Sequence, residues 1–319
     1  LFFSTHKTAS EILSGLVGSE MCIRDRKKDC EHLINLIGKS DIFLHNIRVD
    51  VPKKFGFDSY TLTKKFPTLI YANLGAFGHK GPWKERAGYE PIIQAMAGLM
   101  SINGDPTAPP ARVGVSIIDL STGMWTAIGI LSALAQRSNT GKGCVIDTSL
   151  FETGLMWVSP HAAMFSSAGI LPQRLSSGHP SLAPYQAFTC SDGPLMVCPG
   201  NERLWQKFAT ALDQTHWITN PNYLTNELRV ARRDEVNKMV ESVMVMQSRD
   251  YWRQRLDAAG VPNGPLNTVP EVLELEQTKA LGMMFQPYEK NNGQFHGLPI
   301  SFNGQRAGNN AKAPKLDGK

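Results

Sequence analysis

The sequence predicts an α/β protein with a large domain built on a parallel sheet and a smaller α/β domain after it. In the first half, short apolar runs typical of buried strands alternate with helical patterns, as in parallel sheets. A loop rich in Ser, Pro and Gly, residues 176–184, separates this half from a different pattern. The length of 319 residues suits about two domains.

The first half predicts three strands and the helices that connect them. The helical spacing of Cys30, Leu33, Ile34 and Ile37 predicts a helix that ends at Gly38. Buried strands are expected at 41–45, 69–77 and 145–147, and further helices at 53–66, 88–100, 119–136 and from Ser149 onward.

The helix expected over residues 119–136 has the strongest pattern. Asp119 is placed to cap its N-terminus. One face of this helix is apolar throughout. That face comprises Leu120, Met124, Ile128, Leu131 and Leu134.

The second half predicts a small domain that begins with a β-hairpin. Residues 185–190 and 194–197 flank Ser191-Asp192-Gly193, a turn sequence between two apolar runs. Helices are expected at 202–212, 228–246 and 250–259, a linker at 260–265, and a strand returning to the first domain at 295–302. We therefore expect a large domain at 27–184, a small domain at 185–264, and a linker and return segment at 265–319, with a polar, loosely ordered tail from Gly304.

The first 26 residues differ in style from the rest. The segment lacks the pattern of a signal peptide, and its end, VGSEMCIRDR, resembles the translated read-through of a sequencing adapter. We treat residues 1–26 as non-native; the alternative is a genuine amphipathic helix near residues 9–16.

The composition excludes several classes of function. Apolar residues make up 42% and charged residues 19%, which is ordinary for a soluble protein, and no apolar run approaches the ~20 residues of a membrane helix. The net charge of +5 is scattered, with no compact block of Lys and Arg, and fits an anionic small molecule as well as it fits nucleic acid. Five cysteines without C-x-x-C, and no H-E-x-x-H, indicate no metal site and a reducing, cytoplasmic compartment.

The most informative segment is residues 141–157, GKGCVIDTSLFETGLMW. It predicts a turn, a short strand and then the first turns of an apolar helix, with Glu152 at the helix start. Ser149 and Glu152 match a capping box, S-x-x-E. A carboxylate in this place is either a capping group or a nucleophile, since a helix N-terminus stabilises its ionised form.

The motifs of the chain resemble those of the family III CoA-transferases (CaiB/BaiF), which include formyl-CoA and carnitine CoA-transferases. They span about residues 27–316. In order they are DIFLHNIR at 41–48, FG at 55–56, LIYANLGAFGHKGP at 69–82, GYEPIIQAMAGLM at 88–100, RVG at 112–114, D-x-x-x-G at 119–123, TGKGCVIDTSLFE at 140–152, GH at 178–179, PYQAF at 184–188, GN-x-x-x-W at 200–205 and GVPNGP at 260–265.

The chain departs from the family pattern in two respects. The opening strand and loop that hold part of CoA in the family are missing, as is the helix after residues 314–316, so we expect a fragment truncated at both ends. The family's catalytic carboxylate is most often Asp, whereas Glu152 occupies that position here.

The resemblance implies an enzyme of acyl-CoA metabolism that moves CoA from an acyl-CoA to a free carboxylic acid. Glu152 would be the nucleophile, forming first an anhydride and then a glutamyl-CoA thioester, and we favour this role over capping. The resemblance also implies a large Rossmann-like domain and an interlaced homodimer. CoA and acyl-CoA enter as substrates, and no permanent cofactor is expected.

Two other functions stay open. One is an acyl-CoA racemase or epimerase. Related racemases carry a catalytic His where this chain has Tyr89, so the acid/base group that they need is missing. The other is a CoA-binding relative without turnover.

The resemblance assigns further residues to the site. Asn46, Ile47 and Arg48 would contact the CoA nucleotide, with Arg48 and Lys54 near its phosphates, and Phe55 is grouped with them. The alternatives are an exposed loop arginine for Arg48 and a solvated helix lysine for Lys54.

Four more residues are assigned in the same way. Tyr89, with Glu90, would lie along the pantetheine arm of CoA; the alternative for Tyr89 is a core tyrosine. Gly178 would offer a backbone N–H to an oxyanion and His179 would approach the acceptor carboxylate, although His179 fits a loop histidine without a role equally well.

Two pairs of residues complete the expectations. Arg112 and Arg174 are weaker candidates for neutralising a dicarboxylate, since surface arginines are common. The helical setting of Trp125 and Trp205 predicts that both lie in the core.

Overall fold

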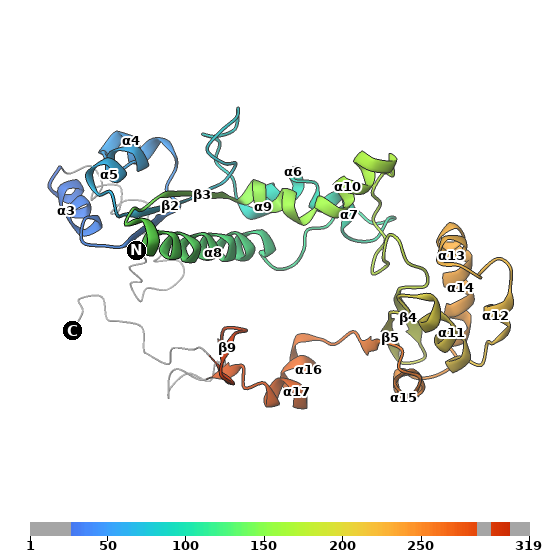
Figure 1. The fold of residues 1–319 in the computed structure, drawn as a ribbon. Coiled ribbons are helices and arrows are strands. Elements are labelled where there is room, and N and C mark those ends of the chain that lie inside the picture. Colours follow the sequence, from blue (N-terminus) through green and yellow to red (C-terminus); the bar gives the residue numbers. More distant parts are fainter. Residues whose placement is uncertain (1–26, 286–294, 307–319) are drawn as a thin grey trace. The chain divides into compact units, whose positions relative to one another are not determined.

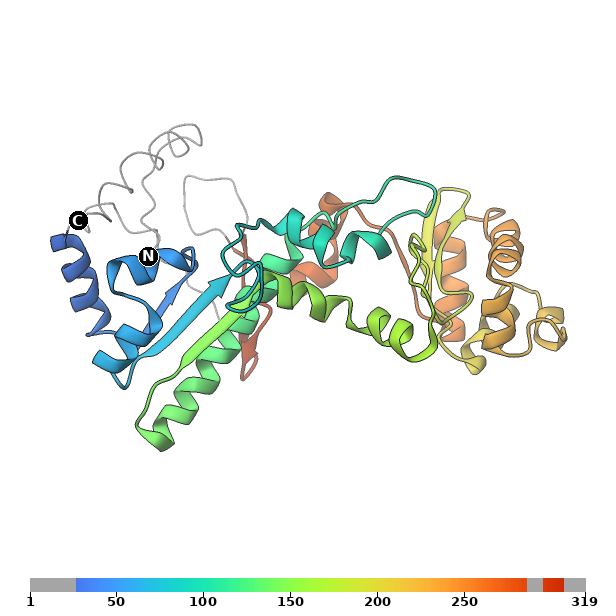
Figure 2. The same cartoon turned by 90° about the horizontal axis from the view of Figure 1, so that it is seen from above.

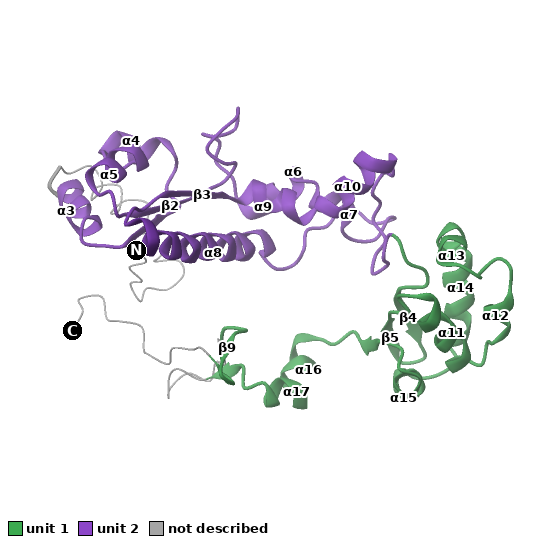
Figure 3. Ribbon diagram, in the orientation of Figure 1, with its two compact units in different colours: residues 1–15, 181–319 green, residues 16–180 purple. Residues whose placement is uncertain are grey.

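The computed structural model describes residues 27–285 and 295–306, so the segment 1–26 and most of the predicted tail lie outside the described residues. The chain divides into two compact units, with the boundary between Pro180 and Ser181 (Figure 3). The second unit includes residues 265–285 and 295–306 together with the predicted small domain.

The first unit is built on a parallel sheet of three strands, in the order β1 (Ile42–His45), β2 (Ile70–Gly75) and β3 (Val145–Ser149). The mixed α/β class and the three predicted strand positions are confirmed. The register places His45, Asn73 and Asp147 side by side across the sheet. Because side chains alternate along a strand, these three share one face.

Helices cover both faces of this sheet (Figure 1). The long helix α8 (Ile117–Thr140) packs against β2 and β3. The face opposite α8, which also carries His45, Asn73 and Asp147, carries Tyr71. Tyr71 packs in one core cluster with Ile37, Phe57 and Leu62. The helices on that side are α3 (Lys27–Ile37), α4 (Asp50–Phe55) and α5 (Ser59–Lys65).

Two of the predicted helices are broken at glycines. The helix expected over 53–66 is divided into α4 and α5, because Gly56 takes a left-handed conformation with φ of 72° and ends α4. Asp58 then caps α5 by accepting from the Thr61 N–H. The helix expected over 88–100 is likewise divided into α6 (Glu90–Met96) and α7 (Leu99–Ile102) at Gly98, whose φ is 88°.

The predictions for α8 are partly wrong. The helix begins at Ile117, so Asp119 lies within its first turn and is not the N-cap. The buried side chains include Ile118, Thr122 and Thr126, and the Thr126 hydroxyl lies 2.7 Å from the Thr148 hydroxyl of β3. The predicted apolar face points to solvent, as does Trp125, which is therefore not in the core. Its exposed members are Leu120, Met124, Ile128 and Leu131, each more than half exposed.

By length and composition, α8 is also the one described helix that could cross a membrane, although the sequence contains no uninterrupted apolar run of that length. The core helices of soluble proteins pass the same test.

The segment 141–157 folds as predicted. Gly141 ends α8 in a left-handed conformation, and β3 leads directly into α9 (Leu150–Trp157), followed by α10 (Ser159–Ala168). Gly143 has no room for a side chain, since a Cβ there would overlap the Leu69 carbonyl. The two glycines of GKGC thus allow the chain to turn tightly into the sheet.

The second unit contains an antiparallel sheet of β4 (Gln186–Cys190), β5 (Gly193–Val197) and β6 (Asn263–Pro265). The predicted hairpin is confirmed. The predicted linker at 260–265 is wrong in part, because β6 pairs with β5 and completes this sheet. Trp205 is 1% exposed and lies in the core, as predicted.

Helices pack around that sheet. The helix expected over 228–246 is two helices that meet at Arg232. The helices of this part are α11 (Glu202–Ala211), α12 (His216–Thr219), α13 (Asn226–Ala231), α14 (Arg233–Met244) and α15 (Arg249–Ala259).

The last described residues form short elements (Figure 2). Residues 295–302 do not form the single returning strand that the sequence predicts. They hold β8 (Phe295–His296), which pairs with β7 (Met284–Phe285), and β9 (Ser301–Phe302), which pairs with β10 (Gln305–Arg306). Two helices precede them, α16 (Val269–Glu274) and α17 (Glu276–Ala280).

Candidate active site

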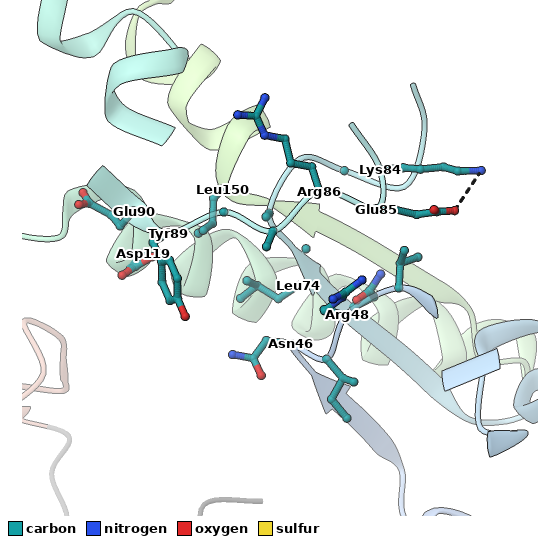
Figure 4. A pocket seen from close by; sticks show the side chains of 18 residues that line it. Asn46, Arg48, Leu74, Lys84, Glu85, Arg86, Tyr89, Glu90, Asp119 and Leu150 are labelled. Atoms are coloured by element: carbon teal, nitrogen blue, oxygen red, sulfur yellow. Dashed lines mark ion pairs between the residues drawn. The ribbon is translucent and has the colours of Figure 1, made fainter. Parts of the chain in front are cut away.

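A cavity of about 570 Å³ opens in the first unit where the parallel strands end (Figure 4). Its wall is formed by the loop after β1, the end of β2, residues from the following loop up to Glu90, Asp119 of α8, and Leu150 at the start of α9. Ligands of open α/β sheets bind outside the carboxyl ends of the strands. The cavity therefore occupies the expected place for a substrate site.

Glu152 lies in the first turn of α9, and its side chain is exposed. The Glu152 N–H donates to Ser149 Oγ at 3.2 Å, and the same hydroxyl donates to Glu152 Oε2 at 2.5 Å. Ser149 thus caps the helix as the motif predicts, while the Glu152 carboxylate receives the hydroxyl.

Glu152 does not itself line the cavity but approaches its wall at Gly78. A Cβ built on Gly78 would lie 3.6 Å from Glu152 Oε2 and from Ser149 Oγ. Gly78 itself lines the cavity and has a φ of 89°, a conformation that favours glycine. The backbone next to Glu152 is held further by the Phe151 N–H, which donates to the Ala76 carbonyl at 2.9 Å.

The loop after β1 contributes three of the predicted residues. Asn46, Ile47 and Arg48 all line the cavity. Asn46 and Arg48 are exposed, whereas Ile47 is half-buried and packs against the core beneath. Arg48 Nε lies 3.3 Å from Asp50 Oδ1, and both side chains remain largely exposed.

Lys54 and Phe55 lie on α4, the helix that follows the β1 loop. Neither lines the cavity. Lys54 Nζ lies 5.0 Å from the centre of the Phe55 ring, a cation–π distance. The structure therefore does not bring these two predicted residues to the cavity wall.

Tyr89 and Glu90 stand together at one side of the cavity, with Asp119 nearby (Figure 4). Tyr89 is 76% exposed, so the core alternative is wrong. Glu90 is 4% exposed; it accepts from Gln94 Nε2 at 2.5 Å, and its other oxygen, 3.6 Å from Arg112, receives no hydrogen bond. Burial and the neighbouring Glu90 charge raise the pKa of Asp119.

Gly178 and His179 do not line the cavity. The Gly178 N–H donates to the Leu175 carbonyl at 2.7 Å and is thus already engaged. Arg174 braces the same region, donating to the carbonyls of Ala108 at 2.6 Å and Pro106 at 3.1 Å. These contacts give Arg174 a structural role in this unit.

A polar group on the sheet itself was not among the predicted site residues. Asn73 Nδ2 donates to Asp147 Oδ1 at 3.3 Å, and His79 Nδ1 lies 3.7 Å from Asp147 Oδ2. Asn73 lines the cavity. The signal in the sequence is a polar residue within each of two apolar strands, whereas Asp147 was predicted to end its strand.

The described part of the chain contains no cluster of three or more groups able to hold a metal ion. Cys144, Cys190 and Cys198 are free thiols. Burial raises the pKa of Cys190 to about 11, so this thiol stays protonated at neutral pH.

A solved structure shows the class to which this fold belongs. The crystal structure of a CaiB/BaiF family protein from Brucella suis matches with a TM-score of 0.77 and 33% identity, covering 92% of this chain and 77% of that one. A Mycobacterium tuberculosis protein matches the fold with a TM-score of 0.84 at 19% identity, over 92% of this chain and 78% of that one.

The family follows from the sequence comparison. The model of CoA-transferase family III matches residues 25–319, and the chain belongs to this family of CoA-transferring enzymes. Acetyl-CoA:oxalate CoA-transferase of Acetobacter aceti is 34% identical over 94% of this chain and 77% of that protein. Succinyl-CoA:glutarate CoA-transferase of Mus musculus is 31% identical over 77% of this chain and 56% of that protein, so the match spans little more than half of the mouse enzyme.

Proposed function

We propose that this chain transfers CoA from an acyl-CoA donor to a free carboxylic acid, with Glu152 as the nucleophile. The observation that carries the proposal is the exposed carboxylate of Glu152 at the start of α9, against Gly78 of the cavity wall. A thioester bound in the cavity would reach this carboxylate without the movement of a buried group.

The chemistry needs only the substrates and one carboxylate. Glu152 attacks the thioester carbonyl, the C–S bond breaks, and the CoA thiolate leaves behind an anhydride. The thiolate then attacks the Glu152 carbonyl, which expels the donor acid and leaves a glutamyl-CoA thioester. The acceptor carboxylate reverses the sequence and departs as the new acyl-CoA, so one difficult exchange is divided into easier steps.

In this proposal the cavity holds CoA as a substrate. Asn46 and Arg48 contact its nucleotide from the loop anchored by Ile47, while Tyr89 and Glu90 flank the arm that leads to the thioester. Lys54 and Phe55 of α4 add charge and an aromatic surface near the phosphates. Gly178 and His179 belong to the loop that approaches the acceptor acid.

We propose a small dicarboxylic acid as the acceptor. The names of the relatives support this class of acceptor. Two of these enzymes are named for oxalate and glutarate, and two others for citramalate and mesaconate. Each of these acids carries two carboxylates on a short carbon chain. One carboxylate would react and the other would serve for recognition.

We further propose an interlaced homodimer that works in the cytoplasm. The exposed apolar face of α8 supports an association, because contiguous apolar patches on a soluble protein mark interaction sites. The free thiols support a reducing compartment.

The first test replaces the nucleophile. Glu152→Gln should lower kcat for transfer between succinyl-CoA and oxalate or glutarate about 10³-fold or more, because the amide cannot form the anhydride. Glu152→Asp keeps the carboxylate but shortens its reach, and should retain part of the rate. A Glu152→Gln enzyme with wild-type turnover would overturn the assignment.

Trapping distinguishes the nucleophile from a cap. Acyl-CoA followed by hydroxylamine should leave a hydroxamate on the peptide that contains Glu152, detected by mass spectrometry, and none in Glu152→Gln. Ser149→Ala removes the cap but leaves the carboxylate, so it should still be trapped. Full transfer activity without modification of Glu152 would contradict the mechanism.

A further inference from the structure

His45 ends β1 immediately before the loop that lines the cavity, and it is 8% exposed. Its ring packs against two aromatic side chains of the same sheet face, with centroid distances of 5.2 Å to Phe43 and 5.2 Å to Tyr71. A buried imidazole at this place is not explained by the transfer chemistry, because it does not line the cavity.

Both ring nitrogens of His45 have partners. The Ile47 N–H donates to Nδ1 at 3.2 Å, and Nε2 lies 2.6 Å from the Tyr71 hydroxyl. Because Nδ1 accepts, the neutral ring carries its proton on Nε2 and donates it to Tyr71. Burial lowers the pKa of His45 to about 4, against a weaker effect of Asp147, so the ring is neutral at pH 7.

The bond to Ile47 fixes the first turn of the loop. The backbone of Ile47 is held by the imidazole, while its side chain packs against the core below. With Ile47 held at both points, the flanking residues Asn46 and Arg48 are left exposed at the cavity wall. A loop held in its binding geometry loses less entropy when a ligand arrives.

We propose that His45 is a positioning residue for CoA: its Nδ1 holds the Ile47 amide and so presents Asn46 and Arg48 to the ligand. The inference rests on the proposed function, in which this loop binds CoA. His45 acts through the loop and not on the reacting atoms. Its loss should therefore raise KM for acyl-CoA and leave kcat almost unchanged.

Two isosteric variants separate the two ring nitrogens. His45→Gln places an amide near Nε2 and loses the acceptor for Ile47, whereas His45→Asn places its oxygen near Nδ1 and keeps that acceptor. We expect His45→Gln to raise KM for acyl-CoA about tenfold, the effect of one lost hydrogen bond, with kcat within twofold. His45→Asn should restore KM to within about threefold of wild type.

The exposed His32 of α3 provides the matched control, and His32→Gln should change neither constant. Tyr71→Phe removes only the partner of Nε2, so it should affect KM less than His45→Gln. Equal KM values for His45→Gln and wild type, or equal losses in His45→Gln and His45→Asn, would overturn the proposal. A fall in kcat with unchanged KM would do the same.

A readout without substrate tests the local arrangement. Long-range ¹H–¹⁵N correlation should show the Nε2-protonated form of His45, and the Ile47 amide should exchange faster in His45→Gln than in His45→Asn. The opposite tautomer would refute the role. If the wild-type enzyme neither binds nor transfers CoA, the proposed function itself fails, whereas failure of the positioning role appears only in the variants.

Discussion

In residues 188–261 the helices and strands close on one continuous core that includes Trp205, Phe208 and Val240, all nearly inaccessible to solvent. In residues 27–180 the parallel sheet supports two smaller clusters, and α8 and α9 keep long apolar side chains exposed. The cavity and Glu152 lie in residues 27–180, the less completely packed region.

This difference has a physical consequence. A unit whose apolar side chains are covered is stabilised by its own core, whereas exposed apolar surface is stabilised only when something else covers it. We therefore expect substitutions in the two units to act independently on local stability, and only those in the unit with the cavity to change turnover. Hydrogen exchange resolved by peptide measures each unit separately.

The largest effect should come from Arg229, which is 1% exposed in the core of the second unit. Its guanidinium donates to the carbonyls of Ala183 and Tyr223 at 2.8 Å each and to Glu202 at 2.9 Å. Arg229→Met leaves these acceptors without a donor and should lower the free energy of unfolding of residues 181–285 by about 3 kcal/mol.

The control is Arg253→Met, which breaks an exposed ion pair with Asp250 and should cost less than about 1 kcal/mol. Protection of residues 27–180 should be unchanged in both variants. If Arg229→Met loosened both units equally, the two would not be independent.

The second effect concerns the packing that holds α9. A Cβ added at Gly154 would lie 2.6 Å from the Ala97 Cβ of the α6 region and 3.4 Å from Ile118, so the helices must separate. Gly154→Ala should destabilise residues 27–180 by about 2 kcal/mol and lower turnover, because Glu152 moves with its helix.

Gly123 of α8 gives the matched substitution, since a Cβ there meets nothing within 4 Å. Gly123→Ala should be neutral or slightly stabilising, as expected for alanine in a helix. Wild-type turnover in Gly154→Ala would show that the position of α9 does not govern the site.

The sequence predicted the strands and the start of α9 because local pattern determines them: an apolar run for β2, and the serine cap for Glu152. It did not predict the breaks at Gly56 and Gly98, because a glycine within a helical pattern does not by itself show that it will take a positive φ. The N-cap at Asp119 was misplaced because the helix begins two residues earlier, at Ile117.

The site was less accessible from sequence than the fold. The contact between Asn73 and Asp147 depends on register between strands 74 residues apart, which periodicity along one strand does not contain. The hydrogen bond from the Ile47 N–H to the His45 imidazole joins residues two apart in the sequence. Its proposed role in ligand binding, however, depends on the cavity that the loop lines. Periodicity also identified the apolar face of α8 without saying which surface covers it.

The smallest effect on local stability should come from that face, and it tests the comparison most directly. Leu131 is 66% exposed, so Leu131→Gln should change the free energy of unfolding of residues 27–180 in the single chain by less than about 0.5 kcal/mol. In the proposed homodimer the same change removes apolar contact and should weaken association, which sedimentation velocity measures across a range of concentrations.

Met246 of the second unit is 73% exposed and provides the control, since Met246→Gln alters an equally exposed apolar side chain outside α8. We expect Leu131→Gln to shift the sedimentation coefficient toward the monomer at concentrations where Met246→Gln and wild type remain dimers. If both variants stay dimeric and equally stable, α8 is not the associating surface, and the exposed apolar side chains of α9, Leu155 and Met156, become the next to test.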